Sequence, residues 1–115
     1  MQSFRSFINE ARDAEPDIYF SHGARKDVIY TAGASDGHTG RIRDSAAKYF
    51  SKINGIDASK VKVGPYLRRG MTEILVQDVD WDELLKYHKA ILAFGKENGL
   101  NGVEAITSGE AGSYR

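Results

Sequence analysis

Glu73 is a candidate general acid or base. Its carboxyl group lies near the start of the apolar, β-rich stretch TEILVQDV. If this stretch is a strand and Glu73 points into the sheet face or a subunit junction, burial disfavours the charged form and raises the pKa of the carboxyl group. If Glu73 faces solvent, it only blunts an edge strand. Glu104, in the last apolar run of the chain, presents the same two alternatives.

A glycine-rich segment, GASDGHTG at residues 33–40, is a candidate anion site. Its glycines let the backbone approach a ligand, and the helix that follows presents free backbone amides to an anion. The segment is neither a Walker loop nor a dinucleotide fingerprint. A tight strand-to-helix connection with Thr39 as the helix cap also explains it. The ligand-binding candidates are Gly33, Ser35, Asp36, Gly37, His38, Thr39, Arg41 and, from a second segment, Arg68.

That second segment is the pair Arg68-Arg69, with Tyr66 beside it. Arginine can hold a phosphate or carboxylate by charge-assisted hydrogen bonds. Adjacent residues of a strand or turn point to opposite sides, so a solvated hairpin tip is the alternative. The spacings of the three histidines match no metal motif, and we expect neither a metal nor a cofactor. His88 lies on an apolar helix stripe, which favours a hydrogen-bonded core or interface role.

The elements that position these residues are clearest between residues 71 and 99. Alternation in residues 71–79 predicts a half-buried strand. Asp80 is a good helix N-cap, and Glu83 can reach back to its amide to form a capping box. Apolar residues at helical spacing then predict an amphipathic helix of about 17 residues. Asn98-Gly99 ends this helix.

Further segments complete the predicted fold. Residues 27–32, 61–63 and 103–106 predict strands, and residues 41–53 predict a helix. The order βαββαβ predicts an α+β, ferredoxin-like domain, a four-stranded antiparallel sheet with two helices on one face. An α+β domain of another order is the alternative. We expect residues 1–20 to form an amphipathic N-terminal helix and linker, residues 21–107 the domain, and residues 108–115 a flexible tail.

Composition indicates one globular domain: 115 residues, 41% hydrophobic and 28% charged. The chain has no cysteine, which excludes disulfides and thiol catalysis, and no apolar run approaches the roughly 20 residues of a membrane span. Residues 41–69 hold eight Lys/Arg and two Asp, a net charge of +6, whereas residues 70–115 hold four Lys/Arg and eight acids, a net charge of −4. The basic middle marks an anion site, a surface between subunits or a solvated helix face. Nucleic-acid binding has no support in this pattern.

The first eleven residues, MQSFRSFINEA, resemble the capsid-targeting segments of internal head proteins from large contractile-tailed phages. Those segments are short amphipathic helices that end at an Ile/Leu-x-Glu site cut by the prohead protease. The matching site here is Ile8-Asn9-Glu10, with cleavage before Ala11. The resemblance implies packaging with the DNA, injection, and action against host defences such as restriction enzymes.

The element order also resembles that of phage S-adenosylmethionine lyases, small anti-restriction enzymes. That family forms trimers of ferredoxin-like subunits with the active site between subunits. It places a tyrosine in the central hairpin and a glutamate just before the hairpin's second strand. Tyr66 and Glu73 occupy comparable positions, so the resemblance implies catalytic roles for both.

We therefore expect a phage-encoded host-takeover or anti-restriction protein that acts by binding and is packaged in the head. The alternatives are a small enzyme of the lyase kind and a plain oligomeric ligand-binding domain. A sheet with helices on one face leaves apolar residues bare on the other, which predicts a homodimer or homotrimer. The expected partner is a host protein or a small anionic, nucleotide-like ligand, with no membrane contact. The expected location is the host cytoplasm, after the virion interior.

Overall fold

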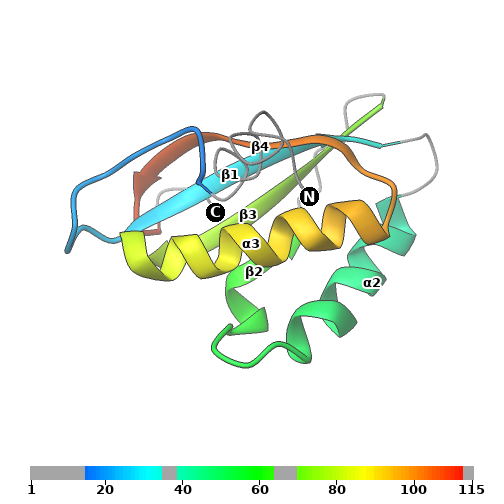
Figure 1. The fold of residues 1–115 in the computed structure, drawn as a ribbon, viewed down its shortest axis with the longest axis horizontal. Helices are drawn as coiled ribbons and strands as arrows, with labels where there is room; N and C mark the ends of the chain where they lie inside the picture. Colours follow the sequence, from blue (N-terminus) through cyan, green and yellow to red (C-terminus); the bar gives the residue numbers. More distant parts are fainter. Residues whose placement is uncertain (1–14, 35–38, 64–69, 113–115) are drawn as a thin grey trace, which may run out of the picture.

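The computed structural model describes residues 15–34, 39–63 and 70–112, and this part of the chain contains four strands and two α-helices (Figure 1). The predicted N-terminal helix and the Ile8-Asn9-Glu10 site lie outside the described residues. The elements are β1 (Lys26–Gly33), α2 (Thr39–Ser51), the short 3-10 helix η1 (Ala58–Lys60), β2 (Val61–Val63), β3 (Met71–Val79), α3 (Trp81–Glu97) and β4 (Asn101–Glu110).

The four strands form one sheet in the order β2-β3-β1-β4, and every neighbouring pair is antiparallel. The long strands β1 and β3 are central, while β2 and β4 are the edges. Each strand–helix–strand connection skips one strand, because β3 lies between β1 and β2, and β1 lies between β3 and β4. The predicted α+β class, with four antiparallel strands and two helices, is confirmed.

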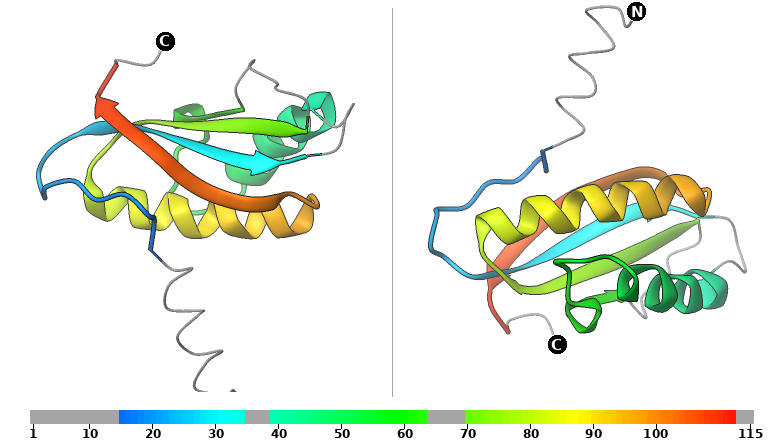
Figure 2. Two further views of the ribbon diagram at one scale, coloured as in Figure 1. Left: turned by 90° about the horizontal axis from the view of Figure 1, so that it is seen from above. Right: turned by 60° about the horizontal axis from the view of Figure 1, so that its bottom comes forward.

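Both helices pack on the core of the sheet through one apolar stripe each. α3 lies across the central strands, and α2 lies beside the β2 edge (Figures 1 and 2). The two helices meet through aromatic rings, since Phe94 of α3 lies with its ring centroid 5.3 Å from Phe50 and 5.4 Å from Tyr49 of α2. The core includes Val28, Tyr30, Ile42, Phe50, Ile74, Val76, Leu84, Ile91 and Phe94.

The N-terminus of α3 has the predicted cap but not the predicted capping box. Asp80 accepts a hydrogen bond from the Glu83 amide at 2.8 Å. The Glu83 carboxylate does not reach back to Asp80; it binds Arg25 and Lys60 instead. Hydrogen bonds from the two nearby cations are charge-assisted, so they are stronger for the Glu83 carboxylate than a bond from the Asp80 amide would be. At the other end, Gly99 has a φ of 69° and ends the helix as predicted.

β4 is longer than the sequence predicts. The predicted run covered residues 103–106, with a tail from residue 108, whereas β4 extends to Glu110 and pairs along the whole of β1. Asp27 explains the extension, because its buried Oδ2 accepts a hydrogen bond from the Gly112 amide at 2.8 Å. This contact spans 85 residues of sequence, so no local pattern reveals it.

Gly95 sets the distance between α3 and β4. A Cβ at this position would lie 2.7 Å from Val103 Cγ2. Glycine in a helix interior normally costs about 1 kcal/mol relative to alanine. Here the clash outweighs that gain, and we expect Gly95→Ala to lower the free energy of unfolding by about 1–2 kcal/mol. Urea denaturation measures the change.

The double variant Gly95→Ala/Val103→Ala is the control for this prediction. It removes the colliding methyl group, so it should be more stable than Val103→Ala alone. A stabilising effect of Gly95→Ala in the original background would contradict the close contact.

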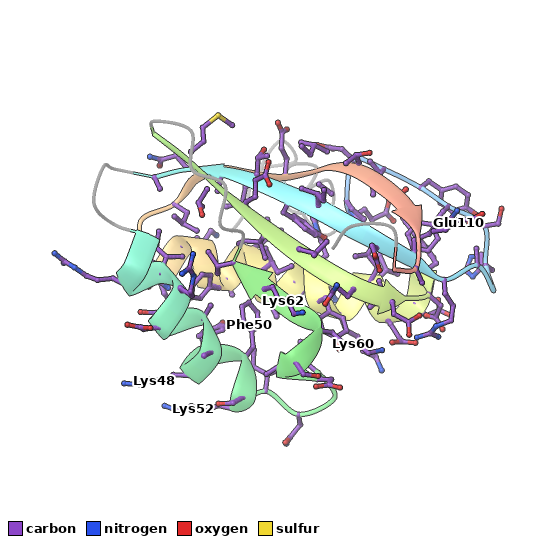
Figure 3. All side chains as sticks on the ribbon, turned by 180° about the vertical axis from the view of Figure 1, so that it is seen from behind. Lys48, Phe50, Lys52, Lys60, Lys62 and Glu110 are labelled. Carbon is purple, nitrogen blue, oxygen red and sulfur yellow. The ribbon has the colours of Figure 1, made fainter. Side chains whose placement is uncertain are left out.

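The face of the sheet turned away from α3 is called the open face below. In the view from behind, the strands lie in front of α3 (Figure 3). Alternation along the strands assigns residues to this face, because their neighbours in the chain point into the core. The described residues of the open face include Ile29, Thr31, Lys62, Met71, Glu73, Leu75, Gln77, Glu104, Ile106 and Thr107.

Candidate functional site

Glu73 lies on the open face, half-buried, near the middle of the sheet. Thr31 of β1 pairs with Glu73 on one side and with Glu104 of β4 on the other. The two carboxylates that the sequence singles out therefore flank one threonine, with their strands separated by roughly 10 Å. Of the alternatives for Glu73, the structure places its side chain on the sheet face that no described helix covers, half-buried.

Next to Glu73 on the open face, the side chains that lie side by side across the strands are apolar at the centre of the sheet. Leu75 pairs with Ile29 on one side and with Lys62 on the other. Ile106 adds to this centre, because β4 carries an extra residue there: Ile29 pairs with Thr107 while Tyr30 pairs with Ala105. The side chain of Ile106 is 47% exposed.

Met71 is the residue of the open face at the start of β3, and it is 42% exposed. Large exposed apolar side chains that gather on one face mark contact surfaces more often than single ones do. The open face thus offers an apolar centre beside two carboxylates, an arrangement suited to contact with another surface.

Two of the loop candidates, Gly33 and Arg41, lie within the described residues. The Ala34 amide donates to the Gly70 carbonyl at 2.9 Å, so the start of the glycine-rich segment lies beside the residue that precedes β3. Packing explains the glycine at position 33, because a Cβ there would lie 3.3 Å from the Asn101 carbonyl oxygen. Arg41 is exposed in the first turn of α2. Ser35, Asp36, Gly37, His38, Tyr66 and Arg68, and the side chain of Thr39, lie outside what the structure describes.

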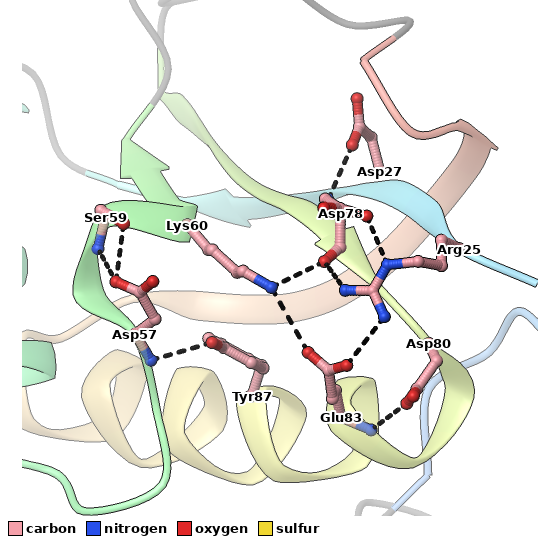
Figure 4. A network of polar contacts seen from close by, with 9 residues as sticks. All are labelled: Arg25, Asp27, Asp57, Ser59, Lys60, Asp78, Asp80, Glu83 and Tyr87. Atoms are coloured by element: carbon pink, nitrogen blue, oxygen red, sulfur yellow. Dashed lines mark hydrogen bonds and ion pairs between the residues drawn. The ribbon is translucent and has the colours of Figure 1, made fainter.

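A polar network that the sequence did not predict lies at the opposite end of the sheet (Figure 4). Arg25 Nε donates to Asp78 Oδ1 at 2.6 Å, and Arg25 Nη1 donates to Glu83 Oε1 at 3.1 Å. Lys60 Nζ donates to the Asp78 carbonyl at 2.9 Å and lies 3.5 Å from Glu83 Oε2. The network joins the segment before β1, the end of η1, the end of β3 and the first turn of α3.

Asp78 sits at the centre of this network in a strained conformation. Its φ of 51° is positive, a region that residues other than glycine seldom adopt. β3 carries an extra residue there, since Lys26 pairs with Val79 and Val28 with Val76. The Asp78 amide donates to Asp27 Oδ1 at 2.8 Å. The side chains of Arg25 and Lys60 donate to the Asp78 carbonyl, and the Asp27 side chain accepts from its amide, so the network holds the strained residue and has a structural role.

Removing Arg25 should change the titration of Asp78. The side-chain hydrogen bond from Arg25 lowers the pKa of the Asp78 carboxyl group. A carboxyl pKa lowered in the folded state stabilises the fold above the ordinary pKa, and this contribution disappears as pH falls through the folded value. We expect Arg25→Ala to raise the pKa of Asp78 towards its ordinary value. Carbon-detected NMR titration of Asp78 measures the change, and Arg43→Ala should leave it unaltered.

His88 is buried as predicted from its place on the apolar stripe. The Tyr30 hydroxyl and His88 Nδ1 form a buried hydrogen bond of 2.8 Å. Burial raises the pKa of Tyr30, so its hydroxyl remains protonated across the physiological range. The pair satisfies two polar groups inside the core and does not face the open face.

Cations gather around α2 and β2. Residues 39–63 hold six Lys/Arg and two Asp, a net charge of +4. Figure 3 shows Lys48 and Lys52 pointing outward from α2 and Lys62 on β2. A groove of about 500 Å³ runs between α2 and β2, with Arg43 and Lys62 among its lining residues. Within the described residues, two cations of the basic middle, Arg43 and Lys62, thus come together at this groove.

No family model, curated protein or solved structure matches this chain. None of the described helices has the length and apolarity needed to cross a lipid bilayer. Within residues 15–34, 39–63 and 70–112, no three acidic or histidine side chains gather closely enough to hold a metal ion. Two surfaces of the described residues, the open face and the groove between α2 and β2, carry side chains that could contact another molecule.

Proposed function

We propose that the protein acts by binding, as a homodimer in which two copies pair their open faces. The apolar centre of the open face, formed by Ile29, Leu75 and Ile106, carries this proposal. Neighbouring strands lie about 4.8 Å apart, and each residue adds about 3.3 Å to the length of a strand. The face of this four-stranded sheet therefore measures roughly 19 by 26 Å. Two such faces together offer about 1,000 Å², which is about the minimum for a specific interface and below the roughly 1,200–2,000 Å² of stable ones.

Light scattering after size-exclusion chromatography tests the dimer. The protein should elute with twice the mass of one chain, and Leu75→Lys should elute as a monomer because it places a charge in the apolar centre. Gln77→Lys is the matched control, since it adds the same charge on the same strand and face outside that centre. A monomeric parent protein with a normal circular dichroism spectrum would reject the dimer.

A second candidate is an enzyme of the S-adenosylmethionine lyase kind. It is favoured by the position of Glu73 on the open face, where a dimer or trimer would cover its carboxylate. Incubation with S-adenosylmethionine should then yield methylthioadenosine and homoserine lactone, and Glu73→Gln should abolish the yield. If no turnover occurs, binding remains the proposed activity.

The proposed setting is a phage infection, in which the protein counters a host defence. Residues 1–11 support it, through their resemblance to capsid-targeting segments. Mass spectrometry of purified virions should detect a chain that begins at Ala11. Virions without this chain would reject head packaging and leave the dimer unaffected.

We further propose that the fold is a variant of the ferredoxin-like one. Read from the β4 edge, the order is β4-β1-β3-β2, and each crossover skips one strand, as in a split βαβ unit. This topology supports the comparison with the lyase family, although fold alone does not determine activity.

A further inference from the structure

We propose that the groove between α2 and β2 binds an extended, acidic peptide segment of another protein. The groove has about 500 Å³, within the range of small-ligand sites. Its lining is largely aliphatic, with Ala46, Ala47, Val61 and Val63 on its walls. Small side chains on α2 leave this space, because alanine occupies two successive positions where longer side chains would fill it.

Charge at the groove selects an acidic occupant. Arg43 of α2 and Lys62 of β2 stand on opposite walls, and both are exposed. Neither forms an ion pair within the described residues, whereas nearby Lys60 is bonded to Asp78 and Glu83. A carboxylate entering the groove would gain charge-assisted hydrogen bonds without displacing an existing partner.

The backbone of β2 favours an extended occupant. In the described part of the sheet, β2 pairs on one side only, with β3. An exposed strand edge presents backbone donors and acceptors that an added strand can use. An added strand alternates its side chains between two faces, so those on the α2 side would meet Ala47 and Arg43, and those on the open-face side would meet Lys62.

A peptide fits the groove better than a nucleic acid does. Proteins that bind single strands stack bases on exposed aromatic rings. Among the described residues no aromatic side chain lines this groove, and Phe50 of α2 is buried in the core. The aliphatic walls thus favour side chains such as valine.

Fluorescence anisotropy with a labelled peptide of alternating glutamate and valine tests the proposal. We expect saturable binding at low salt, and Arg43→Glu should weaken it about tenfold or more. Ala47→Trp should weaken it similarly by filling the groove. Lys48→Glu is the matched control for charge, because Lys48 lies on α2 and does not line the groove; it should change the affinity less than twofold.

Peptide controls separate strand addition from simple charge attraction. A lysine–valine peptide should not bind, and a glutamate–valine peptide with N-methylated amides should bind weakly because it cannot donate to β2. No binding of the glutamate–valine peptide would overturn the proposal. Equal losses in Lys48→Glu and Arg43→Glu, or tighter binding of a single-stranded oligonucleotide, would also overturn it in favour of a general anion surface.

The groove lies at the β2 edge and shares Lys62 with the open face, whereas Ile106 of the apolar centre lies on β4 at the other edge of the sheet. Ile106→Lys should therefore also give a monomer, and because it is remote from the groove it should bind the peptide as tightly as the parent. If it binds tenfold more weakly while folded, the occupant of the groove depends on the second copy and the peptide proposal is overturned.

Discussion

Replacing Phe94 by alanine should lower the free energy of unfolding by about 3–5 kcal/mol. Phe94 is fully buried, and its ring packs against Tyr49 and Phe50. It supplies the aromatic contact by which α3 holds α2 on the domain, so its removal leaves a cavity between the helices. Urea denaturation followed by circular dichroism measures the loss.

Leu92→Ala is the matched control, because Leu92 lies on the same helix and is only half-buried. Its loss should be less than half of that for Phe94→Ala. Equal losses would mean that the aromatic cluster does not join the two helices. The Phe94→Ala protein should also lose peptide binding at the groove, since α2 forms one of its walls.

Replacing Asp27 by alanine should cost about 3 kcal/mol of unfolding free energy. The Asp27 side chain has no exposed surface, and it accepts bonds from the Asp78 and Gly112 amides. Alanine would leave both amides without this acceptor, next to a residue already held at positive φ. Hydrogen exchange should show faster exchange at the end of β4 in addition to the lower global stability.

Asp27→Asn and Asp44→Ala are the controls. Asparagine keeps one acceptor oxygen, so it should lose roughly half as much as alanine does. Asp44 is exposed on α2, and its replacement should change stability by less than about 0.5 kcal/mol. If Asp27→Ala matched Asp44→Ala, the bulge at Asp78 would need no support from Asp27.

The sequence predicted those elements whose signals are local. β3 and α3 have the predicted bounds, because strand alternation and the Asp80 cap act within a few residues. Prediction from the sequence failed where contacts between residues far apart in the chain determine the structure. The end of β4 depends on Asp27, and the orientation of Glu83 depends on Arg25, 58 residues away.

The surfaces were predictable in part. Alternation identified Glu73 as a residue of one sheet face, although only the strand order shows that Glu104 flanks the same threonine. The basic groove was visible as a net positive stretch, but its shape requires α2 and β2 to lie side by side. The successive alanines at 46 and 47 were the one local sign of an unfilled space.

Because Ile106 is an extra residue of β4, the apolar surface of the open face can be reduced without disturbing the pairing of the strands. The ladder between β1 and β4 pairs Ile29 with Thr107 and Tyr30 with Ala105, so Ile106 has no cross-strand partner on β1. A chain shortened by this one residue would keep Ala105 and Ser108 directed as they are now. Such a deletion variant should therefore fold and remain monodisperse while losing one hydrophobic anchor, which offers a route to an assembly-deficient protein without any inserted charge.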